Sequence, residues 1–251
     1  AGGIEEDIIK CLQPTYIAGE EKFDGGKLRK KRINRVGNLL VPNKNYCEFQ
    51  NWMEPLLDNL HDEQEWMWSK EKIQKRTSTF AWTPSKIIER LGKEIDNEDS
   101  IIYWAYKNEI PVFCPTFTDG SIGDQLFFHS YKRPGFVVDV VSDARELKDL
   151  AVNSHATGMI CIGGGSVKQT MCRANLMRDG ADFAVFLDSE TSLEEERSRG
   201  TIRSTDDAVK LDVSSTIAFP LIVSQTFGKE MNEWEEQKKD SVCWVHDIKA
   251  E

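Results

Sequence analysis

The stretch from Thr157 to Phe186 constrains the fold of this chain more than any other segment. It begins with a short apolar run, Met159–Ile162, whose β-branched residues are typical of a buried parallel strand. A glycine turn and a helical pattern ending near Asp179-Gly180 separate this run from a second one, Ala181–Phe186. This order predicts a strand–helix–strand unit with the glycine turn at the carboxyl end of its first strand, where open α/β sheets usually bind ligands.

The glycine turn, Gly163–Gly165, has two interpretations. Backbone N–H groups can approach a ligand closely where side chains are absent, and Ser166 is a plausible N-cap of the helix that follows. The turn does not have the spacing GxGxxG, however. The pattern alone therefore leaves two alternatives equally open: a dinucleotide-binding turn, and a tight turn without a ligand.

Strand and helix patterns alternate along the rest of the chain. Apolar runs predict strands over 32–42, 111–117 and 136–141, and helical spacing predicts helices over 46–60, 84–92, 99–107, 143–152 and 220–237. We therefore expect an α/β fold with a Rossmann-like, doubly wound, mainly parallel sheet and helices on both faces. The chain is expected to form one domain over residues 1–251, with residues 62–79 as a charged insertion loop or, alternatively, a solvated helix.

Composition excludes several classes of function. The chain has 251 residues and a net charge of −10, and no basic face or run predicts binding to nucleic acid. No apolar run is long enough to span a bilayer, so no membrane association is predicted. The cysteines form no CxxC pair, which favours reduced thiols in a cytoplasmic protein. No metal site is predicted.

Two further segments combine glycine with carboxylates. In Ala1–Asp7, acidic residues crowd the first turn of a predicted helix, where they stabilise the helix dipole or, alternatively, face a cationic ligand. In Thr118–Asp124, one aspartate could hold a ribose hydroxyl and the other an ammonium group. The alternative for the second segment is a Gly/Asp turn with a capping aspartate.

The chain resembles the deoxyhypusine synthase family along nearly its whole length, through the segments AGGIEEDIIKCLQPTY, INRVGNLLVPNKNYCEF, WTPSKIIERLGKEI, IPVFCPTFTDGSIGDQLFFHSYK, TGMICIGGG, ANLMRDGADFAV and FPLIVSQTF. The resemblance implies a Rossmann-like fold, tetramers built from tight dimers, and active sites at the dimer interface. In the family's reaction, NAD takes a hydride from spermidine. An active-site lysine then captures the aminobutyl group as an imine and passes it to a lysine of translation initiation factor 5A.

The resemblance also implies which residues form the site. Glu5 and Asp124 match two carboxylates that face the polyamine in the family. Paired carboxylates can bind the ammonium groups of a polyamine and offset the cost of removing them from water. The NAD-binding positions that it implies are Ala1, Gly2, Glu6, Asp119, Gly164, Ser189, Ser214 and Ser215. At Ser189, Ser214 and Ser215, the family has other residues than serine.

The resemblance breaks at the nucleophile. In the family, a segment of the type EAVSWGKIR carries the lysine beside a tryptophan, in an apolar slot that makes the uncharged amine available. The matching segment here, Glu195–Arg203, reads EERSRGTIR, with Thr201 at the lysine position and Arg199 at the tryptophan position. A threonine cannot form the imine, and an arginine repels a cationic substrate. Gln169 replaces a histidine that contacts the polyamine, and the polyamine loop is shortened around Ser189–Leu193.

These departures, beside intact glycine turns, predict a regulatory, catalytically impaired subunit. Its expected partners are a lysine-bearing synthase paralogue in a heterotetramer and, through that complex, spermidine and the precursor of translation initiation factor 5A. One alternative is an active synthase that works without the imine, and another is an NAD- or polyamine-responsive binding module. An amino-terminal segment of the family's domain is expected to lie outside this sequence, which begins at Ala1.

Overall fold

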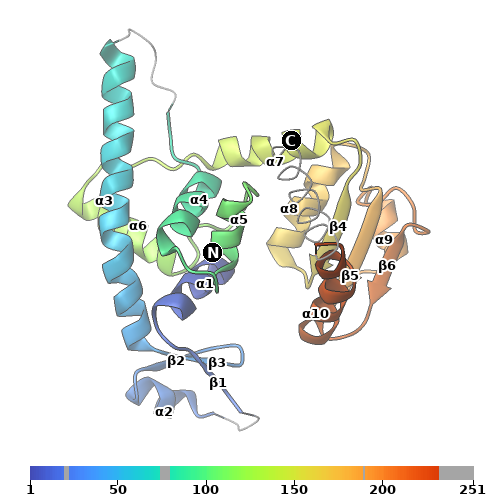
Figure 1. Cartoon of the computed structure of the whole chain (residues 1–251), viewed down its shortest axis with the longest axis horizontal. Coiled ribbons are helices and arrows are strands. Elements are labelled where there is room, and N and C mark those ends of the chain that lie inside the picture. The colour runs from blue at the N-terminus through green and yellow to red at the C-terminus, as the bar shows by residue number, and fades with distance from the viewer. Residues whose placement is uncertain (20–22, 74–79, 189, 232–251) are drawn as a thin grey trace, which may run out of the picture. The chain divides into compact units, whose positions relative to one another are not determined.

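The structure is a computed structural model that describes residues 1–19, 23–73, 80–188 and 190–231 (Figure 1). The chain divides into two compact units, Ala1–Leu147 and Lys148–Glu251, and the expected single domain over residues 1–251 stays a prediction. The reason is that the buried apolar residues form two separate clusters, one within each unit. No helix within the described ranges has the length and apolar character that crossing a membrane requires.

The first unit is mainly helical and carries a small antiparallel sheet with the strand order β1-β3-β2. Its strands are β1 (Tyr16–Ile17), β2 (Ile33–Val36) and β3 (Leu39–Pro42). Its helices are α1 (Gly2–Leu12), α2 (Gly25–Lys30), α3 (Asn43–Ile73), α4 (Pro84–Ile95), α5 (Ile101–Lys107), α6 (Ser121–Lys132) and most of α7 (Val140–Asn153). The core contains fully buried residues of α1, α3 and α4, among them Ile8, Phe49, Leu57, Ile88 and Leu91.

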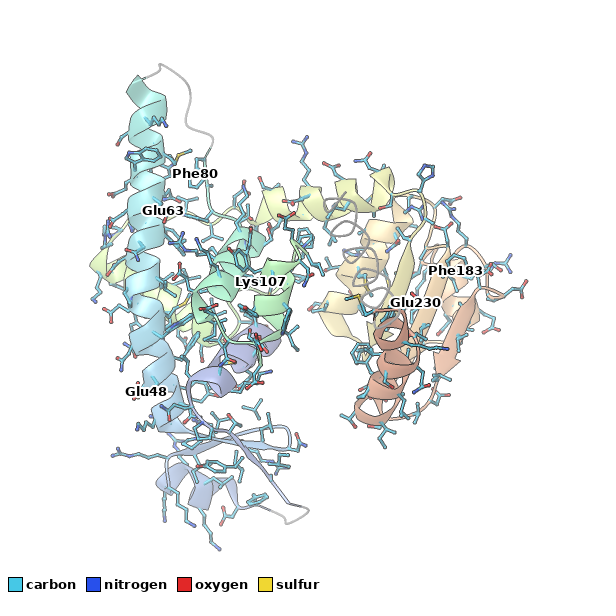
Figure 2. All side chains as sticks on the ribbon, in the orientation of Figure 1. Glu48, Glu63, Phe80, Lys107, Phe183 and Glu230 are labelled. Carbon is cyan, nitrogen blue, oxygen red and sulfur yellow. The ribbon has the colours of Figure 1, made fainter. Side chains whose placement is uncertain are left out.

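The expected insertion loop is wrong for residues 62–73, because helix α3 continues through them. Residues 74–79 lie outside the described part of the chain. Glutamate, glutamine, lysine and methionine dominate the segment, and all of them favour a helix. The indole of Trp68 also donates a hydrogen bond to the carbonyl of Phe80 (2.7 Å), which attaches this part of α3 to the start of the next segment. Charged side chains, among them Glu48 and Glu63, extend outward from α3 at several points along its length (Figure 2).

Two expected strands of the first unit do not form. Residues 111–117 belong to no strand, and two prolines in this segment lack the N–H group that a sheet needs. In 136–141, Val138 makes only an isolated bridge to Trp82. Asp139 then accepts hydrogen bonds from the N–H groups of Val141 (2.9 Å) and Ser142 (3.0 Å), so it starts helix α7 where the apolar run suggested a strand.

Several other expectations are confirmed or refined. The expected strand over 32–42 is a hairpin of β2 and β3, with Gly37 at φ 60° in its turn. The expected helices over 84–92 and 99–107 correspond to α4 and α5. Thr83 caps α4, because its hydroxyl accepts a hydrogen bond from the N–H of Lys86 (3.3 Å).

The second unit contains the strand–helix–strand arrangement predicted for 157–186. Its three strands, β4 (Gly158–Ile162), β5 (Phe183–Leu187) and β6 (Ala208–Leu211), are parallel and follow the order β4-β5-β6. Its helices are α8 (Gly165–Leu176), α9 (Leu193–Ser198) and α10 (Ser215–Gln225), so the last helix begins before the expected residue 220. The α/β class with a parallel sheet is therefore confirmed.

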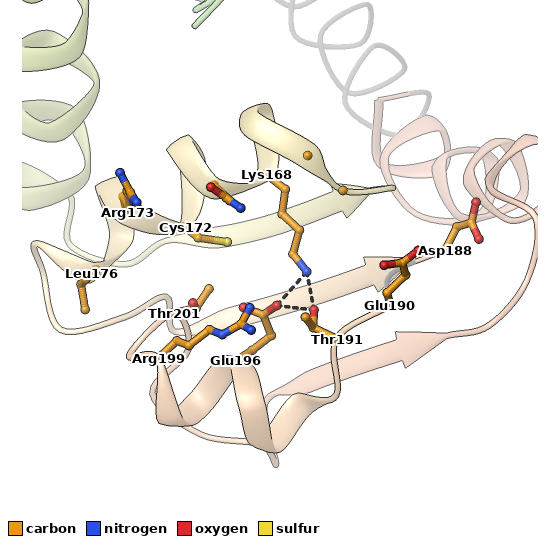
Figure 3. Close-up of a pocket in the computed structure, with 13 residues that line it drawn as sticks. Lys168, Cys172, Arg173, Leu176, Asp188, Glu190, Thr191, Glu196, Arg199 and Thr201 are labelled. Carbon is orange, nitrogen blue, oxygen red and sulfur yellow. Dashed lines mark hydrogen bonds and ion pairs between the residues drawn. The ribbon is translucent and has the colours of Figure 1, made fainter. Parts of the chain in front are cut away.

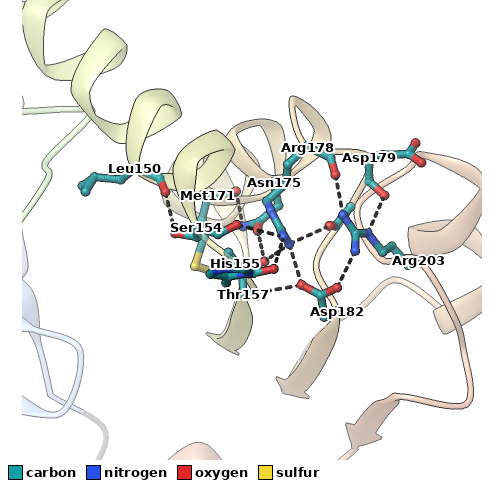
Figure 4. Close-up of polar contacts among 11 residues, drawn as sticks. Leu150, Ser154, His155, Thr157, Met171, Asn175, Arg178, Asp179, Asp182 and Arg203 are labelled. Carbon is teal, nitrogen blue, oxygen red and sulfur yellow. Dashed lines mark hydrogen bonds and ion pairs between the residues drawn. The ribbon is translucent and has the colours of Figure 1, made fainter.

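A half-buried network of polar side chains fixes the end of α8 to the sheet (Figure 4). Arg178 donates to a carboxylate oxygen of Asp182 (2.6 Å) and to the hydroxyl of Thr157 (2.8 Å). Arg203 donates to the other oxygen of Asp182 (2.5 Å). The hydrogen bond from Arg178, the backbone N–H of Thr157 and the charges of both guanidinium groups lower the pKa of Asp182 to about 2. The turn between α8 and β5 is thereby held by charge-assisted hydrogen bonds.

Candidate functional site

The candidate site is a pocket of about 720 Å³ in the second unit, beside the glycine turn (Figure 3). One wall is a face of α8, and the opposite wall is formed by the segment after β5 and by α9 with the residues that follow it. The lining residues are Gly164, Gly165, Lys168, Gln169, Cys172, Arg173, Leu176, Asp188, Glu190, Thr191, Glu196, Arg199 and Thr201. The pocket thus contains Thr201, Arg199, Gln169 and Gly164, which the sequence singled out.

The glycine turn is open toward the pocket. Gly163 and Gly165 have φ values of 71° and 79°, in the left-handed region that favours glycine. The N-cap of α8 is Gly164 rather than the predicted Ser166, and no side chain caps this helix end. A Cβ atom added at Gly164 would meet nothing within 4 Å. The first-turn N–H groups of α8 can therefore receive an anionic group of a ligand.

A buried ion pair occupies the middle of the pocket. The ammonium of Lys168 lies 2.7 Å from a carboxylate oxygen of Glu196 and 2.6 Å from the hydroxyl of Thr191. Thr191 also donates a hydrogen bond to Glu196. Burial opposes the ionisation of Glu196, but the hydrogen bonds from Lys168 and Thr191 outweigh this effect and lower the pKa of its carboxyl. The side-chain nitrogen of Lys168 is thus engaged with Glu196 and Thr191 and is not free to attack a carbon atom.

Thr201, at the position where the resemblance places the nucleophilic lysine, is 3% exposed. Its N–H donates to the carbonyl of Glu196 (3.0 Å), and its own carbonyl accepts from the N–H of Ala181 (2.9 Å). Gly200, at φ 71°, makes the turn that leads from α9 to this residue. Among the lining residues, the only lysine is Lys168. The pocket therefore offers a hydroxyl and an ion-paired ammonium where the family's chemistry needs an uncharged amine.

In the first unit, two of the predicted acidic residues have structural partners. Glu5 is buried, and its carboxylate accepts a hydrogen bond from the N–H of Ile122 (3.1 Å), at the start of α6. A side chain at Gly120 would collide with this carboxylate. Glu6 accepts a hydrogen bond from the hydroxyl of Tyr46 (3.1 Å), and burial raises the pKa of Glu6. The polyamine role of Glu5 stays a prediction, but the structure also gives it the role of a helix cap.

The remaining predicted residues of this unit lie near the same helix ends. The backbone nitrogen of Ala1 lies 2.7 Å from the carbonyl oxygen of Thr116 and close to the carboxylate of Asp119. Asp124 is exposed in the first turn of α6, and Gly2 is exposed in α1. The first unit therefore gathers its predicted residues around the starts of α1 and α6.

Two of the last predicted NAD positions, Ser214 and Ser215, are not among the described residues that line the pocket. Ser214 is the N-cap of α10, with its hydroxyl 2.7 Å from that of Thr216, and Ser215 is the first residue of that helix. Ser189 lies outside the described residues. The pairing of Glu196 with Lys168 was not predicted. A usable signal was present on α8, where the lining residues recur at helical spacing: 165, 168, 169, 172, 173 and 176.

The second unit is a Rossmann-like α/β ligand-binding unit, because a glycine turn ends its first parallel strand and opens a helix beside a pocket. The family model described as deoxyhypusine synthase matches residues 1–226. The chain therefore belongs to the deoxyhypusine synthase family.

Individual relatives agree with this assignment. The chain is 50% identical to a deoxyhypusine synthase of Senecio vernalis over 238 residues, which cover 90% of this chain and 61% of that protein. It is 49% identical to homospermidine synthase 2 of the same plant over 240 residues, which cover 90% and 62%. It resembles a crystal structure from Entamoeba histolytica, described as a deoxyhypusine synthase, with a TM-score of 0.57, 28% identity and coverage of 90% and 63%. The chain spans about three fifths of the length of these relatives.

Proposed function

We propose that this chain belongs to a catalytically impaired deoxyhypusine synthase subunit that acts together with a lysine-bearing paralogue in a heterotetramer. The observation that carries the proposal is the buried Thr201 at the position of the nucleophilic lysine. A threonine hydroxyl cannot form an imine with the aminobutyl group. The nearby Lys168 does not replace it, because Glu196 holds its ammonium in an ion pair.

The arginines of the pocket disfavour the family's polyamine in their own neighbourhood, although Asp188, Glu190 and Glu196 equal the lining cations in number. Arg173 and Arg199 both line it, and Arg199 stands where the family has a tryptophan. Like charges that meet in a partly desolvated pocket repel more strongly than in bulk water. Spermidine is therefore expected to bind weakly at this subunit's own pocket and to react in the site that the partner completes.

The binding of NAD is part of this proposal. The open start of α8 and the uncapped turn at Gly164 fit an anionic cofactor group, and the exposed carboxylate of Asp119 fits a ribose hydroxyl. NAD, when bound, supplies the acceptor for the hydride that leaves spermidine. In a regulatory subunit these residues would hold the cofactor or shape its site without carrying the covalent step.

The test uses the full-length protein that contains this chain, alone and mixed with the lysine-bearing synthase of the same organism. Labelled spermidine, NAD and the precursor of translation initiation factor 5A are supplied, and borohydride traps any imine. We expect no product and no trapped adduct with the protein alone, and both with the mixture, where the adduct is on the partner. Full activity of the protein alone would end the proposal.

The second candidate is an active synthase that transfers the aminobutyl group directly, without an imine. The similarity of about 50% to proteins named as synthases favours it. One of these relatives is named homospermidine synthase 2, so the assay follows homospermidine as a second product. Direct transfer predicts product from the protein alone, with no borohydride adduct on this chain.

A further inference from the structure

A second hollow, in the first unit, is lined by arginines. It has a volume of about 520 Å³ and lies between α2, β2 and the start of α3. Arg29, Arg32 and Arg35 line it together with Asn34, and none of its lining residues is acidic. The chain as a whole carries a net charge of −10, so a cluster of positive charge is not expected from its composition. The feature is separate from the pocket beside the glycine turn.

The cations come from one short segment. Residues 27–35 read KLRKKRINR and contain no aspartate or glutamate. In the part of the chain that the structure describes, no carboxylate forms an ion pair with Arg29, Arg32 or Arg35, and the nearby Asp24 pairs with Lys27 instead. The three arginines are exposed. Apart from Nε of Arg35, which donates to the carbonyl of Gly37, their guanidinium N–H groups are therefore available to an anion from solution.

The backbone holds two of these arginines in defined positions. Arg32 has φ 56°, an uncommon conformation for a residue with a side chain, and its carbonyl accepts a hydrogen bond from the N–H of Asn43 (2.8 Å). Arg35 donates from Nε to the carbonyl of Gly37 (2.9 Å), and its guanidinium lies 5.8 Å from the ring centre of Phe23. A fixed guanidinium loses less conformational entropy when it binds a ligand.

We propose that this hollow binds a small molecule that carries at least two linked phosphate groups. Guanidinium groups bind phosphate through two parallel hydrogen bonds, and several of them can share a chain of phosphates. The volume falls within the range of about 300–1,000 Å³ that is typical of small-molecule sites. A nucleic acid would need basic residues along an extended path, and the acidic remainder of the chain does not provide them.

The test measures the binding of tripolyphosphate to the full-length protein by calorimetry at low ionic strength. We expect saturable binding that weakens steeply as salt is added. The double variant Arg29→Gln/Arg32→Gln should lower the affinity by about tenfold or more, because it removes two guanidinium groups that donate charge-assisted hydrogen bonds to phosphate. The variant Arg29→Lys/Arg32→Lys keeps the charge but loses the paired donors, so an intermediate loss is expected.

A matched control removes the same charge elsewhere in the first unit. Lys86→Gln/Lys93→Gln changes two residues of α4 that line a different hollow, one that also contains Glu89. This variant should bind tripolyphosphate as the unchanged protein does. An equal loss in both double variants would show attraction by overall charge only and would overturn the proposal, as would the absence of saturable binding to the unchanged protein.

Two further titrations distinguish the source of the phosphate chain. Tighter binding of a nucleoside triphosphate than of tripolyphosphate identifies a nucleotide, and equal binding identifies a free oligophosphate. A nucleoside monophosphate should bind more weakly than both, and equally tight binding of it would contradict the need for linked phosphates. Because the readout is binding at the first unit, the result does not depend on whether the proposed synthase function is correct.

Discussion

At the scale of single residues, the loss of the lysine is accompanied by a change beside it. Glu196 is 2% exposed, and its hydrogen bonds with Lys168 and Thr191 lower the pKa of its carboxyl. The backbone carbonyl of Glu196 also accepts a hydrogen bond from the N–H of Thr201. Any amine placed at position 201 would therefore enter the field of an ionised carboxylate, which stabilises the ammonium form. Restoring the lysine alone is not enough to restore the chemistry.

The variant Thr201→Lys should accordingly form no imine with the aminobutyl group, whereas the double variant Thr201→Lys/Glu196→Ala should form it. Labelled spermidine, NAD and borohydride, followed by mass measurement of the chain, detect the adduct. Glu196→Ala alone is the control, because it releases Lys168 from its ion pair without adding an amine at position 201, and peptide mapping then assigns the adduct of the double variant to residue 201. Equal labelling of the single lysine variant and the double variant would show that Glu196 has no influence.

The Lys168–Glu196 pair also makes a prediction about stability. Its side chains are 12% and 3% exposed, and removing one member of a buried pair leaves the other charge uncompensated. We expect Lys168→Met to lower the free energy of unfolding by about 3 kcal/mol, and Lys168→Met/Glu196→Leu to cost less than the sum of the single changes. Urea unfolding measures both.

An exposed pair provides the comparison. Lys132 and Glu54 are 61% and 40% exposed, so Lys132→Met should cost less than about 1 kcal/mol. Similar costs for Lys132→Met and Lys168→Met would contradict the importance of burial. The same result would weaken the argument that Lys168 is held in its ion pair with Glu196.

At the scale of elements, the turn between β4 and α8 contains two glycines that differ in backbone conformation but not in the space around them. Replacing each by alanine therefore tests whether backbone strain alone requires glycine there. A Cβ atom would meet nothing within 4 Å at either Gly164 or Gly165, but only Gly165 has a positive φ, of 79°. Gly165→Ala should therefore lower the free energy of unfolding by about 1–2 kcal/mol. Gly164→Ala, at φ −142°, should change it by less than about 0.5 kcal/mol. Chemical denaturation of the two variants decides, and equal costs would argue against strain.

The network that joins α8 to β5 makes the second unit sensitive to acid. The pKa of Asp182 is about 2 in the folded chain, against an ordinary value of 3.8, because Arg178 and Arg203 stabilise its charge. A group with a lowered pKa in the folded state contributes stability above its ordinary pKa and loses it as the pH falls toward the folded value. Asp182→Asn should thus lower the melting temperature at neutral pH, and the difference should shrink between about pH 4 and pH 2.

The matched control for this prediction is Asp179→Asn. Asp179 has φ 67°, which asparagine also tolerates, and it contacts Arg203 only through its carbonyl oxygen. The variant should therefore show the same acid dependence as the unchanged protein. A difference between Asp182→Asn and the unchanged protein that stayed constant down to pH 2 would contradict the assignment.

The sequence predicts a structural feature correctly where the contacts that form the feature lie between residues close in the chain. The apolar run Met159–Ile162, the glycines and the helix after them act within a few residues, and this unit is confirmed. The run 136–141 also has strand-forming residues, but one capping side chain, Asp139, turns it into a helix start. In the pocket, Glu196 pairs with a residue 28 positions away, and no local pattern predicts such a contact.

At the scale of the whole molecule, retention and loss follow the two units. The first unit keeps exposed carboxylates at Asp119 and Asp124, beside the starts of α1 and α6. The second unit keeps the open glycine turn but lacks the nucleophile and holds its pocket lysine in an ion pair. Under the proposed function, such a subunit would keep groups that bind and shape a site without carrying the covalent step, and would complete a partner's site.

This reasoning predicts how activity depends on the ratio of the two subunits. If the full-length protein containing this chain is titrated into a fixed amount of the lysine-bearing synthase, the rate of product formation should rise and then level off near equal amounts, because each added subunit completes one partner. Adding more lysine-bearing synthase to a fixed amount of this protein should level off in the same way, because the excess partner lacks the subunit that completes it. A partner whose nucleophilic lysine is changed to alanine should give no product at any ratio. A linear rise with this protein, or product with the alanine partner, would place the chemistry on this chain and favour direct transfer.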